Sequence, residues 1–346
     1  MRHQRSLTRL LSFSIACVLL AACSGPGGTG ASSPSAIGTR PVPLTVGLGY
    51  IPSVQFAPFY LAQRAGYYQA AGLSVTFQNK IDPDLVTLVG QGQIDIGIAD
   101  GTSVIPAVSQ GIPIRYVATI YAVFPNVVYA KVSSGIRSAA DLRGKRLGTP
   151  GRYGSSWIML QALLASAGLT PSDLTIALYP DFGQSTALER GAVDAATGFV
   201  NNEPVTLGLA GTPVSVLHAD ASVPLPGNGL IASQQTIAGK RAALAAFVAA
   251  TLRAMREIRA DPARGLDAAV AAVPALGNDR AVQLAILNAT IATWTNGYVK
   301  AHGLGAIDRD AWTRTVSFMA GLPDTPINGS PPKVDALVDA SLLPAS

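Results

Sequence analysis

Charged residues are scarce in this chain. Only 13% of its 346 residues are Asp, Glu, Lys or Arg, roughly half of the fraction that soluble domains usually carry. Apolar residues make up 49%, and this combination excludes an intrinsically disordered chain and a charge-rich coiled coil. The length allows two domains of ordinary size, or one large domain, with ample core.

Residues that build catalytic and metal sites are also rare. The two cysteines, Cys17 and Cys23, both lie near the N-terminus, so we expect a folded part without a disulfide, a Cys-type metal site or a thiol nucleophile. His218 and His302 are far apart in sequence and no H-E-x-x-H motif is present. We therefore expect no metal, no cofactor and no catalytic residues, and nothing in the sequence requires an enzyme.

The excess of positive charge is confined to the N-terminus. The chain has 25 basic and 20 acidic residues, but Arg2, Arg5 and Arg9 fall within residues 1–22, which hold no Asp or Glu. The remainder has 22 basic and 20 acidic residues, a net charge of +2, with no basic run. We therefore expect no nucleic-acid partner.

The apolar stretch over residues 10–22 is too short to cross a membrane. Thirteen residues span ~20 Å as a helix, against a hydrocarbon core of ~30 Å. A basic start, a short apolar middle and small residues after it are typical of a secretory signal peptide, here residues 1–22. Leu20-Ala21-Ala22-Cys23 resembles the lipobox of bacterial lipoproteins, in which the cysteine is acylated. The alternative is an ordinary signal peptide cleaved elsewhere, with Cys23 incidental.

After the signal, strands alternate with helices. Residues 24–40 are rich in Gly, Ser and Pro, and residues 23–43 are predicted to form a lipid-anchored flexible linker. The alternation predicts βαβ units and mostly parallel sheets. Expected strands cover 44–48, 74–78, 94–99, 115–120, 146–149, 175–178, 193–199 and 214–218, expected helices cover 57–70, 85–90, 103–109, 155–167 and 185–190, and residues from 234 onward are mainly helical, with a long Ala-rich stretch over 238–260.

An internal similarity favours two lobes. Residues 90–97 resemble residues 190–196, because each segment has a glycine stop followed by an aspartate, Asp95 or Asp194, in an apolar strand. The alternative is chance likeness between two helix-to-strand turns. We prefer two similar α/β lobes with a cleft between them.

Candidate binding residues follow several of these strands. Three glycines and then Ser155-Ser156 open a helix after the strand over 146–149, which presents backbone N–H groups and hydroxyls to a ligand. Glu203 is flanked by amides in Asn201-Asn202-Glu203-Pro204 and suits an amine or a ring N–H. Aromatic residues near strand ends could stack on a flat heterocycle, although some belong to the core; they are Tyr50, Phe56, Phe59, Tyr121, Phe124, Tyr153, Trp157 and Phe199.

These segments resemble one family. GYIPSVQFAPFY at residues 49–60, together with the segments at 66–73, 134–145, 151–156, 202–204 and 228–231, is similar to bacterial solute-binding proteins of importers for nitrate, sulfonate, taurine and thiamine pyrimidine precursors. The resemblance implies a periplasmic-binding-protein type II fold, α/β, with two lobes of mixed, mostly parallel sheets and a central ligand cleft. It implies lobe 1 over residues 44–129 and 226–346, lobe 2 over residues 130–225, and a ligand site made of Tyr50, Gln55, Phe59, Asp100, Gly101, Thr102, Tyr121, Tyr153, Gly154, Ser155, Ser156, Trp157, Asn202 and Glu203.

The resemblance also implies a function. We expect a monomeric, extracytoplasmic lipoprotein, anchored to a cell membrane at Cys23, that closes over a small molecule and delivers it to an ABC permease with a cytoplasmic ATPase. The aromatic opening and the NNEP segment are more similar to binders of thiamine pyrimidine precursors or riboflavin. The alternatives are a sulfonate, taurine or nitrate binder, a ligand sensor, and a pyrimidine-synthase-like enzyme. Those synthases carry a Cys-rich motif and a reactive histidine in the cleft, and this chain has no cysteine beyond position 23.

Overall fold

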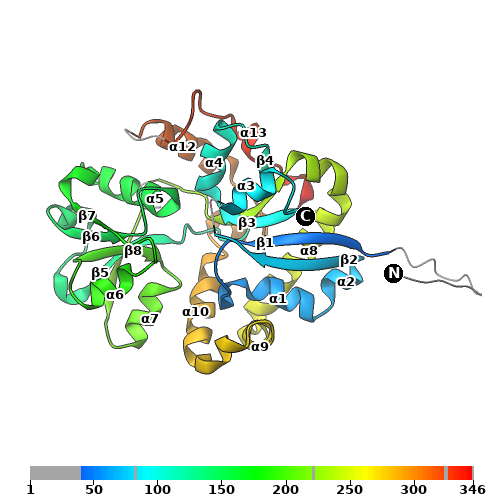
Figure 1. The fold of residues 1–346 in the computed structure, drawn as a ribbon, viewed down its shortest axis with the longest axis horizontal. Helices are drawn as coiled ribbons and strands as arrows, with labels where there is room; N and C mark the ends of the chain where they lie inside the picture. The colour runs from blue at the N-terminus through cyan, green and yellow to red at the C-terminus, as the bar shows by residue number, and fades with distance from the viewer. Residues whose placement is uncertain (1–39, 82–83, 220–222, 323–325, 345–346) are drawn as a thin grey trace, which may run out of the picture. The chain divides into compact units, whose positions relative to one another are not determined.

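The computed structural model describes residues 40–81, 84–219, 223–322 and 326–344 (Figure 1). The expected signal peptide, the lipidation site Cys23 and nearly all of the linker lie outside the described residues. Residues 40–346 form one compact unit. Among the described residues, no helix combines the length and apolar character needed to cross a bilayer.

The unit contains two five-stranded sheets, each the centre of one lobe. In lobe 1 the strand order is β2-β1-β3-β10-β4, and β10 alone runs antiparallel to its neighbours. Its strands are β1 (Val42–Leu48), β2 (Leu73–Asn79), β3 (Ile96–Asp100), β4 (Ile114–Thr119) and β10 (Asn228–Ser233).

The sheet of lobe 2 repeats this plan in the order β7-β6-β8-β5-β9, with β5 antiparallel to both neighbours. The expected α/β fold with mixed, mostly parallel sheets is therefore confirmed. The strands of lobe 2 are β5 (Asn126–Lys131), β6 (Arg146–Thr149), β7 (Thr175–Leu178), β8 (Ala195–Phe199) and β9 (Val214–His218).

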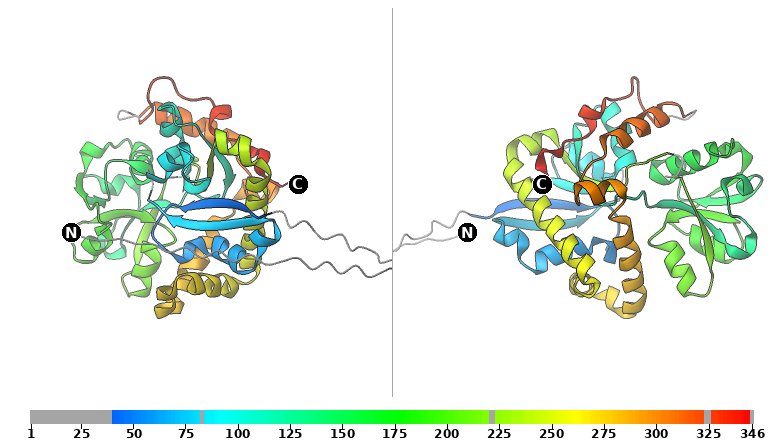
Figure 2. Two further views of the ribbon diagram at one scale, coloured as in Figure 1. Left: turned by 45° about the vertical axis from the view of Figure 1, so that its right-hand side comes forward. Right: turned by 180° about the vertical axis from the view of Figure 1, so that it is seen from behind.

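Helices cover the sheets and fill the C-terminal part of lobe 1, where α8 runs the length of the lobe (Figure 2). Gly66, in the left-handed conformation at φ 73°, divides the expected helix over 57–70 into α1 and α2. The helices of lobe 1 are α1 (Ala57–Arg64), α2 (Tyr67–Ala70), α3 (Asp84–Gly90), α4 (Gly101–Ser109), α8 (Gln234–Ala260), α9 (Pro262–Ala272), α10 (Arg280–Thr293), α11 (Gly297–His302), α12 (Arg309–Ala320) and α13 (Val334–Leu337); those of lobe 2 are α5 (Gly154–Ala165), α6 (Gln184–Glu189) and α7 (Glu203–Leu209).

The chain passes between the lobes twice, after β4 and after β9 (Figures 1 and 2). The lobe boundary expected at 129/130 falls inside β5, which pairs with β8 and β9 from Asn126 onward. We therefore propose that the first crossing lies at residues 120–125. In each lobe, the antiparallel strand is the one that enters directly after a crossing.

The internal similarity between residues 90–97 and 190–196 corresponds to the same structural feature in both lobes. In each, an aspartate makes two hydrogen bonds to one residue of the neighbouring strand, and we call this pair of bonds a bracket. In lobe 1 the Asp95 carboxylate accepts the Thr45 N–H at 2.9 Å, and the Asp95 N–H bonds the Thr45 carbonyl at 2.9 Å. Asp194 and Arg146 make the equivalent pair of bonds in lobe 2, both at 2.8 Å. Each aspartate thus ties the start of the third parallel strand to the first.

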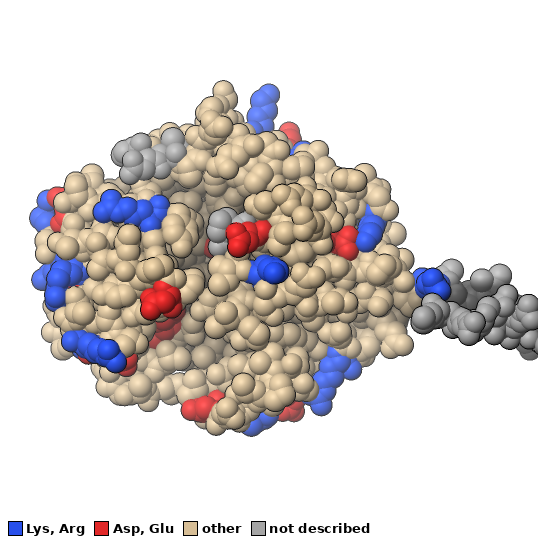
Figure 3. Space-filling model, viewed as in Figure 1, with Lys and Arg blue, Asp and Glu red and all other residues tan. Residues whose placement is uncertain are grey.

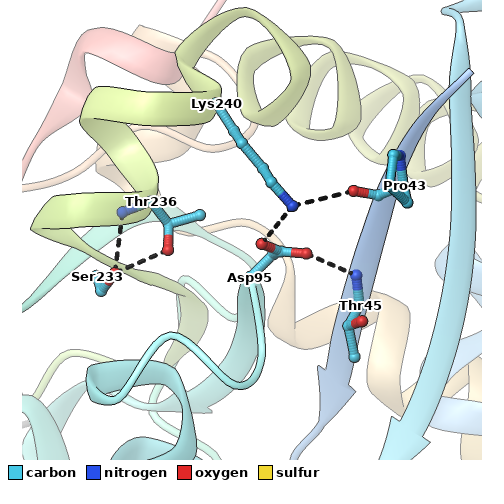
Figure 4. Close-up of polar contacts among 6 residues, drawn as sticks. All are labelled: Pro43, Thr45, Asp95, Ser233, Thr236 and Lys240. Carbon is cyan, nitrogen blue, oxygen red and sulfur yellow. Dashed lines mark hydrogen bonds and ion pairs between the residues drawn. The ribbon is translucent and has the colours of Figure 1, made fainter.

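A cation completes each bracket. Lys240, the one residue of α8 outside helical φ/ψ, reaches Asp95 at 2.8 Å and the Pro43 carbonyl at 3.1 Å (Figure 4). In lobe 2 the guanidinium of Arg146 contacts Asp194 at 3.1 Å. The lysine therefore joins the C-terminal helical region to the first strand, whereas the arginine acts within its own sheet.

We expect Asp95→Ala to lower the free energy of unfolding by about 1–3 kcal/mol, because the Thr45 N–H and the Lys240 ammonium lose their shared acceptor. Asp194→Ala is the matched control. Its ion pair is more exposed, with side chains 34% and 49% accessible against 14% and 36% for Asp95 and Lys240, so its loss is smaller. Chemical denaturation measures both variants; an equal or larger loss for Asp194→Ala contradicts this interpretation.

Candidate functional site

A cavity of about 1110 Å³ lies between the lobes, where strands of both sheets end. Ligands of open α/β sheets bind at this place, beyond the carboxyl ends of parallel strands. On the face seen in Figure 3, Lys and Arg side chains are scattered and most of the surface is uncharged. The cavity is therefore the candidate functional site, and this face carries no basic patch.

Most residues of the expected ligand site line this cavity. Phe59 does not: it is 1% exposed and stacks on Phe247 at 6.2 Å in the core of lobe 1. Thr102 is fully buried, and a side chain at Gly101 would collide with the backbone of the second crossing at Pro226. The eleven that line it are Tyr50, Gln55, Asp100, Tyr121, Tyr153, Gly154, Ser155, Ser156, Trp157, Asn202 and Glu203.

Asp100 lines the cavity and joins the two lobes. It is the last residue of β3, and its carboxylate accepts hydrogen bonds from Ser155 Oγ of lobe 2 and Asn228 Nδ2 of lobe 1. Asn126 Nδ2 donates to Ser155 Oγ at 3.1 Å and to Ser156 Oγ at 2.9 Å. Burial raises the pKa of the Asp100 carboxyl, and the bonds from Ser155 and Asn228 offset part of that rise. The N-terminus of α5 thus already faces a carboxylate.

Glu203 provides a second buried carboxylate, at the first position of α7. Its Oε2 accepts the Phe199 N–H at 2.8 Å, while Oε1 is 3.5 Å from Asn202 Nδ2, the limit of a hydrogen bond. Burial raises the pKa of Glu203, and the Phe199 N–H offsets part of this. Burial first, and then the charge of Glu203, also raise the pKa of Tyr50. One oxygen of Glu203 is therefore weakly satisfied and available to a ligand donor.

Amide side chains add unused hydrogen-bonding atoms. Asn228 gives its Nδ2 to Asp100, and Gln184 gives its Nε2 to the Thr197 carbonyl at 3.1 Å. Within the described part of the chain, Asn228 Oδ1 and Gln184 Oε1 are buried without a donor. Since both residues line the cavity, they offer acceptors to a ligand that brings N–H or O–H groups.

Aromatic rings from both lobes meet at the cavity. Tyr50 and Phe182 pack edge to face, with ring centroids 6.0 Å apart. Phe182, at φ 61°, is the only non-glycine with positive φ among the described residues, a conformation that is strained for a bulky side chain. The Arg152 guanidinium lies 5.4 Å from the centre of the Trp157 ring. The cavity thus combines flat apolar surfaces with buried acceptors.

Sequence reasoning missed Phe182, Gln184 and Asn228 as lining residues. Phe182 follows β7 within Tyr179-Pro180-Asp181-Phe182-Gly183, and this turn signal after a strand could have indicated it. Asn228 opens the family-like segment 228–231, and this signal could have indicated it. Gln184 carries no comparable signal, because its position depends on which strands become neighbours. Neither histidine lines the cavity, and the described residues include no cluster of His, Cys, Asp or Glu suited to a metal ion.

Comparison with known proteins adds a family and a fold. Residues 53–265 match the family model described as NMT1/THI5 like. The riboflavin-binding protein RibY of Chloroflexus aurantiacus is 34% identical over 336 residues, covering 92% of this chain and 95% of that protein. A 4-amino-5-hydroxymethyl-2-methylpyrimidine phosphate synthase of Aspergillus parasiticus is 31% identical over 153 residues, which are 44% of each chain.

Among solved structures, the alkanesulfonate-binding protein SsuA of Xanthomonas axonopodis pv. citri, bound to MOPS, has a TM-score of 0.66 at 18% identity, covering 88% of this chain and 99% of that one. At this identity the likeness shows the fold alone. It is the periplasmic-binding-protein fold expected from the sequence, with a cleft between two lobes. The matched family model and the extent of the RibY similarity show that the chain belongs to the NMT1/THI5-like family.

Proposed function

We propose that the protein is the extracytoplasmic substrate-binding component of an ABC importer and that it captures a neutral, flat heterocycle, with riboflavin as the first candidate. The observation that carries this proposal is the combination of buried, unused acceptors with aromatic rings in a cavity between two lobes. The name of its relative RibY, a riboflavin-binding protein, supports the choice of a flavin.

The hydrogen-bonding groups that line the cavity favour a ligand that donates hydrogen bonds. Asp100, Glu203, Asn228 and Gln184 all line the cavity, and Asn228 Oδ1 and Gln184 Oε1 are buried acceptors without a donor among the described residues. The ring N–H and the hydroxyls of riboflavin, or the amino group of an aminopyrimidine, satisfy such acceptors. The rings of Tyr50, which is half-buried, and Tyr153, which is exposed, line the cavity and offer stacking surfaces for a planar ring.

The same groups disfavour a sulfonate or nitrate. An oxyanion requires cations or several convergent donors. Arg152 is the only Lys or Arg that lines the described cavity, it is exposed, and it lies over Trp157. A bound anion would instead meet the carboxylates of Asp100 and Glu203, and like charges at close range destabilise binding.

Ligand capture proceeds by closure of the lobes. The Asp100–Ser155 hydrogen bond and the Tyr50–Phe182 ring contact both connect lobe 1 to lobe 2. A ligand that touches both walls adds contacts that exist only in the closed state, and this difference in free energy drives closure. Release to a permease then requires that the two inter-lobe contacts break.

The remaining parts of the proposal concern location and partners. A lipid at Cys23 anchors the protein to a membrane, the linker holds the monomeric folded unit near its surface, and a permease with a cytoplasmic ATPase receives the ligand. An enzymatic role like that of the partly matching synthases is the competing function. The chain has no cysteine beyond position 23, and no histidine lines the described cavity. A cysteine nucleophile or a histidine that carries a proton is therefore not present there for such a reaction.

Titration of the purified protein with riboflavin, an aminopyrimidine, taurine and nitrate tests the proposed function. We expect saturable riboflavin binding with quenching of the flavin fluorescence, because the ring stacks on aromatic side chains. Calorimetry measures the two anions, which we expect not to bind. Binding of the anions alone would contradict the proposal, and release of a modified product on prolonged incubation would favour the enzyme.

A further inference from the structure

The cavity continues away from the strand ends, between α4 and α5. On α4 it is lined by Ser103, Pro106 and Ala107, followed by Gln110, which is the i, i+3, i+4, i+7 spacing of one helical face. On α5 it is lined at the same spacing by Gly154, Trp157, Ile158 and Gln161. Two helices therefore present one face each to a single continuous space.

The extension of the cavity runs along α4 and α5, away from the strand ends. Both helices begin at the central cavity, α4 after Asp100 and α5 at Gly154, and they pack against each other between the lobes (Figure 1). The ten steps along the chain from Asp100 to Gln110 correspond to roughly 15 Å along a helix. We name this extension the α4–α5 arm and define it by Ser103, Pro106, Ala107, Gln110, Ile158 and Gln161.

The chemistry of the α4–α5 arm is neutral and hydrogen-bonding. One hydroxyl, of Ser103, and two amides, of Gln110 and Gln161, alternate with the apolar Pro106, Ala107 and Ile158 along its walls. None of these residues carries a charge. Such a surface accommodates a slender chain that bears hydroxyl groups, since amides and hydroxyls both donate and accept.

Gln161 is the strongest indication of a ligand. Its side chain is only 5% exposed, and its Nε2 has no hydrogen-bond partner among the described residues. A buried amide donor without an acceptor is unfavourable, and Gln161 lines the arm. Because Nε2 itself has almost no accessible surface, a rotation of the Gln161 amide would bring it to an oxygen atom of a bound molecule, which would satisfy it.

We propose that the α4–α5 arm is a second subsite, which takes the neutral polyhydroxylated chain of a ligand whose ring occupies the central cavity. This inference rests on the proposed function and makes it more specific. It assigns the ligand class as a heterocycle that carries a polyol, in preference to the bare ring or to a form phosphorylated at the end of the chain. The total volume of about 1110 Å³ lies slightly above the ~300–1,000 Å³ range for small-molecule pockets, which leaves room for a two-part ligand.

The phosphorylated form is disfavoured for an electrostatic reason. No Lys or Arg is among the described residues of the arm, and Asp84 of α3 lines the same cavity. A terminal phosphate would therefore gain no cation in the arm, and a carboxylate in the same cavity would disfavour it. The absence of Lys and Arg among the described residues of the arm thus disfavours the phosphorylated ligand.

Three flavins that share one ring system test the subsite. Riboflavin carries the polyol, lumiflavin carries a methyl group in its place, and riboflavin 5′-phosphate carries a charged end. We expect the protein to bind riboflavin about tenfold more tightly than either of the others, the effect of roughly one well-placed hydrogen bond to a buried group. Gln161→Met removes the amide at similar volume, and we expect it to lose the preference for riboflavin over lumiflavin while binding lumiflavin as the wild type does.

The controls separate this inference from the proposed function. Gln235→Met makes the same chemical change at an exposed position of α8 and should keep all three affinities. Lumiflavin binding by Gln161→Met reports that this variant is folded. If riboflavin and lumiflavin bind equally well to the wild type, or the phosphate binds best, the subsite is overturned and the proposed function stands; if no flavin binds, the proposed function is overturned and the subsite with it.

Discussion

The Glu203→Gln protein should bind riboflavin more weakly than the wild type by about 1–3 kcal/mol, or roughly 5- to 150-fold. Glu203 Oε2 holds the Phe199 N–H at 2.8 Å, whereas Oε1 has only a 3.5 Å contact with Asn202. A glutamine would keep its oxygen on the Phe199 N–H, so its NH₂ would replace the acceptor that we assign to the ligand. Fluorescence titration at fixed pH measures the loss.

A substitution at Gly198 tests the role of the Glu203 carboxylate without changing Glu203 itself. A Cβ added at Gly198 would lie 2.6 Å from Glu203 Oε2 and 2.8 Å from Tyr129 Cε1, closer than real contacts allow. Gly198→Ala must therefore displace Glu203, and we expect a loss of affinity similar to that of Glu203→Gln. Gly208→Ala, on α7 with nothing within 4 Å of its added Cβ, is the control that should bind normally. Unchanged affinity in both Glu203→Gln and Gly198→Ala would remove Glu203 from the site.

The Asp100→Asn protein should be more thermally stable than the wild type at neutral pH, yet bind riboflavin less well. Because burial raises the pKa of Asp100, the native state holds this proton more tightly than the unfolded state does. Ionisation therefore costs stability as the pH rises through the native pKa, and asparagine avoids this cost. Ser155 Oγ can accept as well as donate, and Asn228 has an unused Oδ1, so the amide fits. Each kcal/mol gained in the free energy of unfolding raises the midpoint temperature of thermal unfolding by about 2–4 °C.

The pH profile makes this prediction specific. The gain in the unfolding midpoint for Asp100→Asn should shrink as the pH falls through the raised pKa of Asp100, and vanish near the ordinary carboxyl value of about 4. Asp141→Asn is the control of opposite sign, because backbone N–H groups of Arg137 and Ser138 lower the pKa of Asp141. That variant should be less stable than the wild type at neutral pH and equal to it in strong acid. A gain for Asp100→Asn that does not depend on pH would rule out burial of the charge as its cause.

The parallel strands were predictable because each has a local signature. An apolar run with a glycine on one side and a helix on the other predicted β3, β6 and β8 within a few residues. The likeness between the Asp95 and Asp194 segments also predicted a repeated plan, and both brackets exist.

The two antiparallel strands could not be found in this way. No strand was expected over 126–131 or 228–233, although β5 and β10 complete both sheets. Each is a short run that enters directly after a lobe crossing, and its place in the sheet depends on partners about 70 to 130 residues away in the chain. Such pairing is a tertiary effect that local patterns do not encode.

The same limit applies to the cavity. Residues at or shortly after a strand end, such as Asp100, Tyr153 and Glu203, were identified because strand ends converge in this class of fold. Phe59 was misjudged because an aromatic residue near a strand end has the same local pattern whether it faces a cleft or Phe247 in the core. The α4–α5 arm was missed altogether, since it exists only where helices of the two lobes meet.

The position of β10 has a consequence for the order in which the chain folds. Strand β10 lies between β3 and β4, which do not pair with each other, so the sheet of lobe 1 cannot close until residues 228–233 are present. The described strands of lobe 2, in contrast, all lie within the continuous segment 126–218. As the chain emerges from the ribosome, N-terminus first, lobe 2 can therefore complete its sheet first. Strands β1 to β4 of lobe 1 stay in two separate groups until β10 is present. The lobe that emerges first is the last to become native, and its unpaired strand edges are the ones that a chaperone would need to protect.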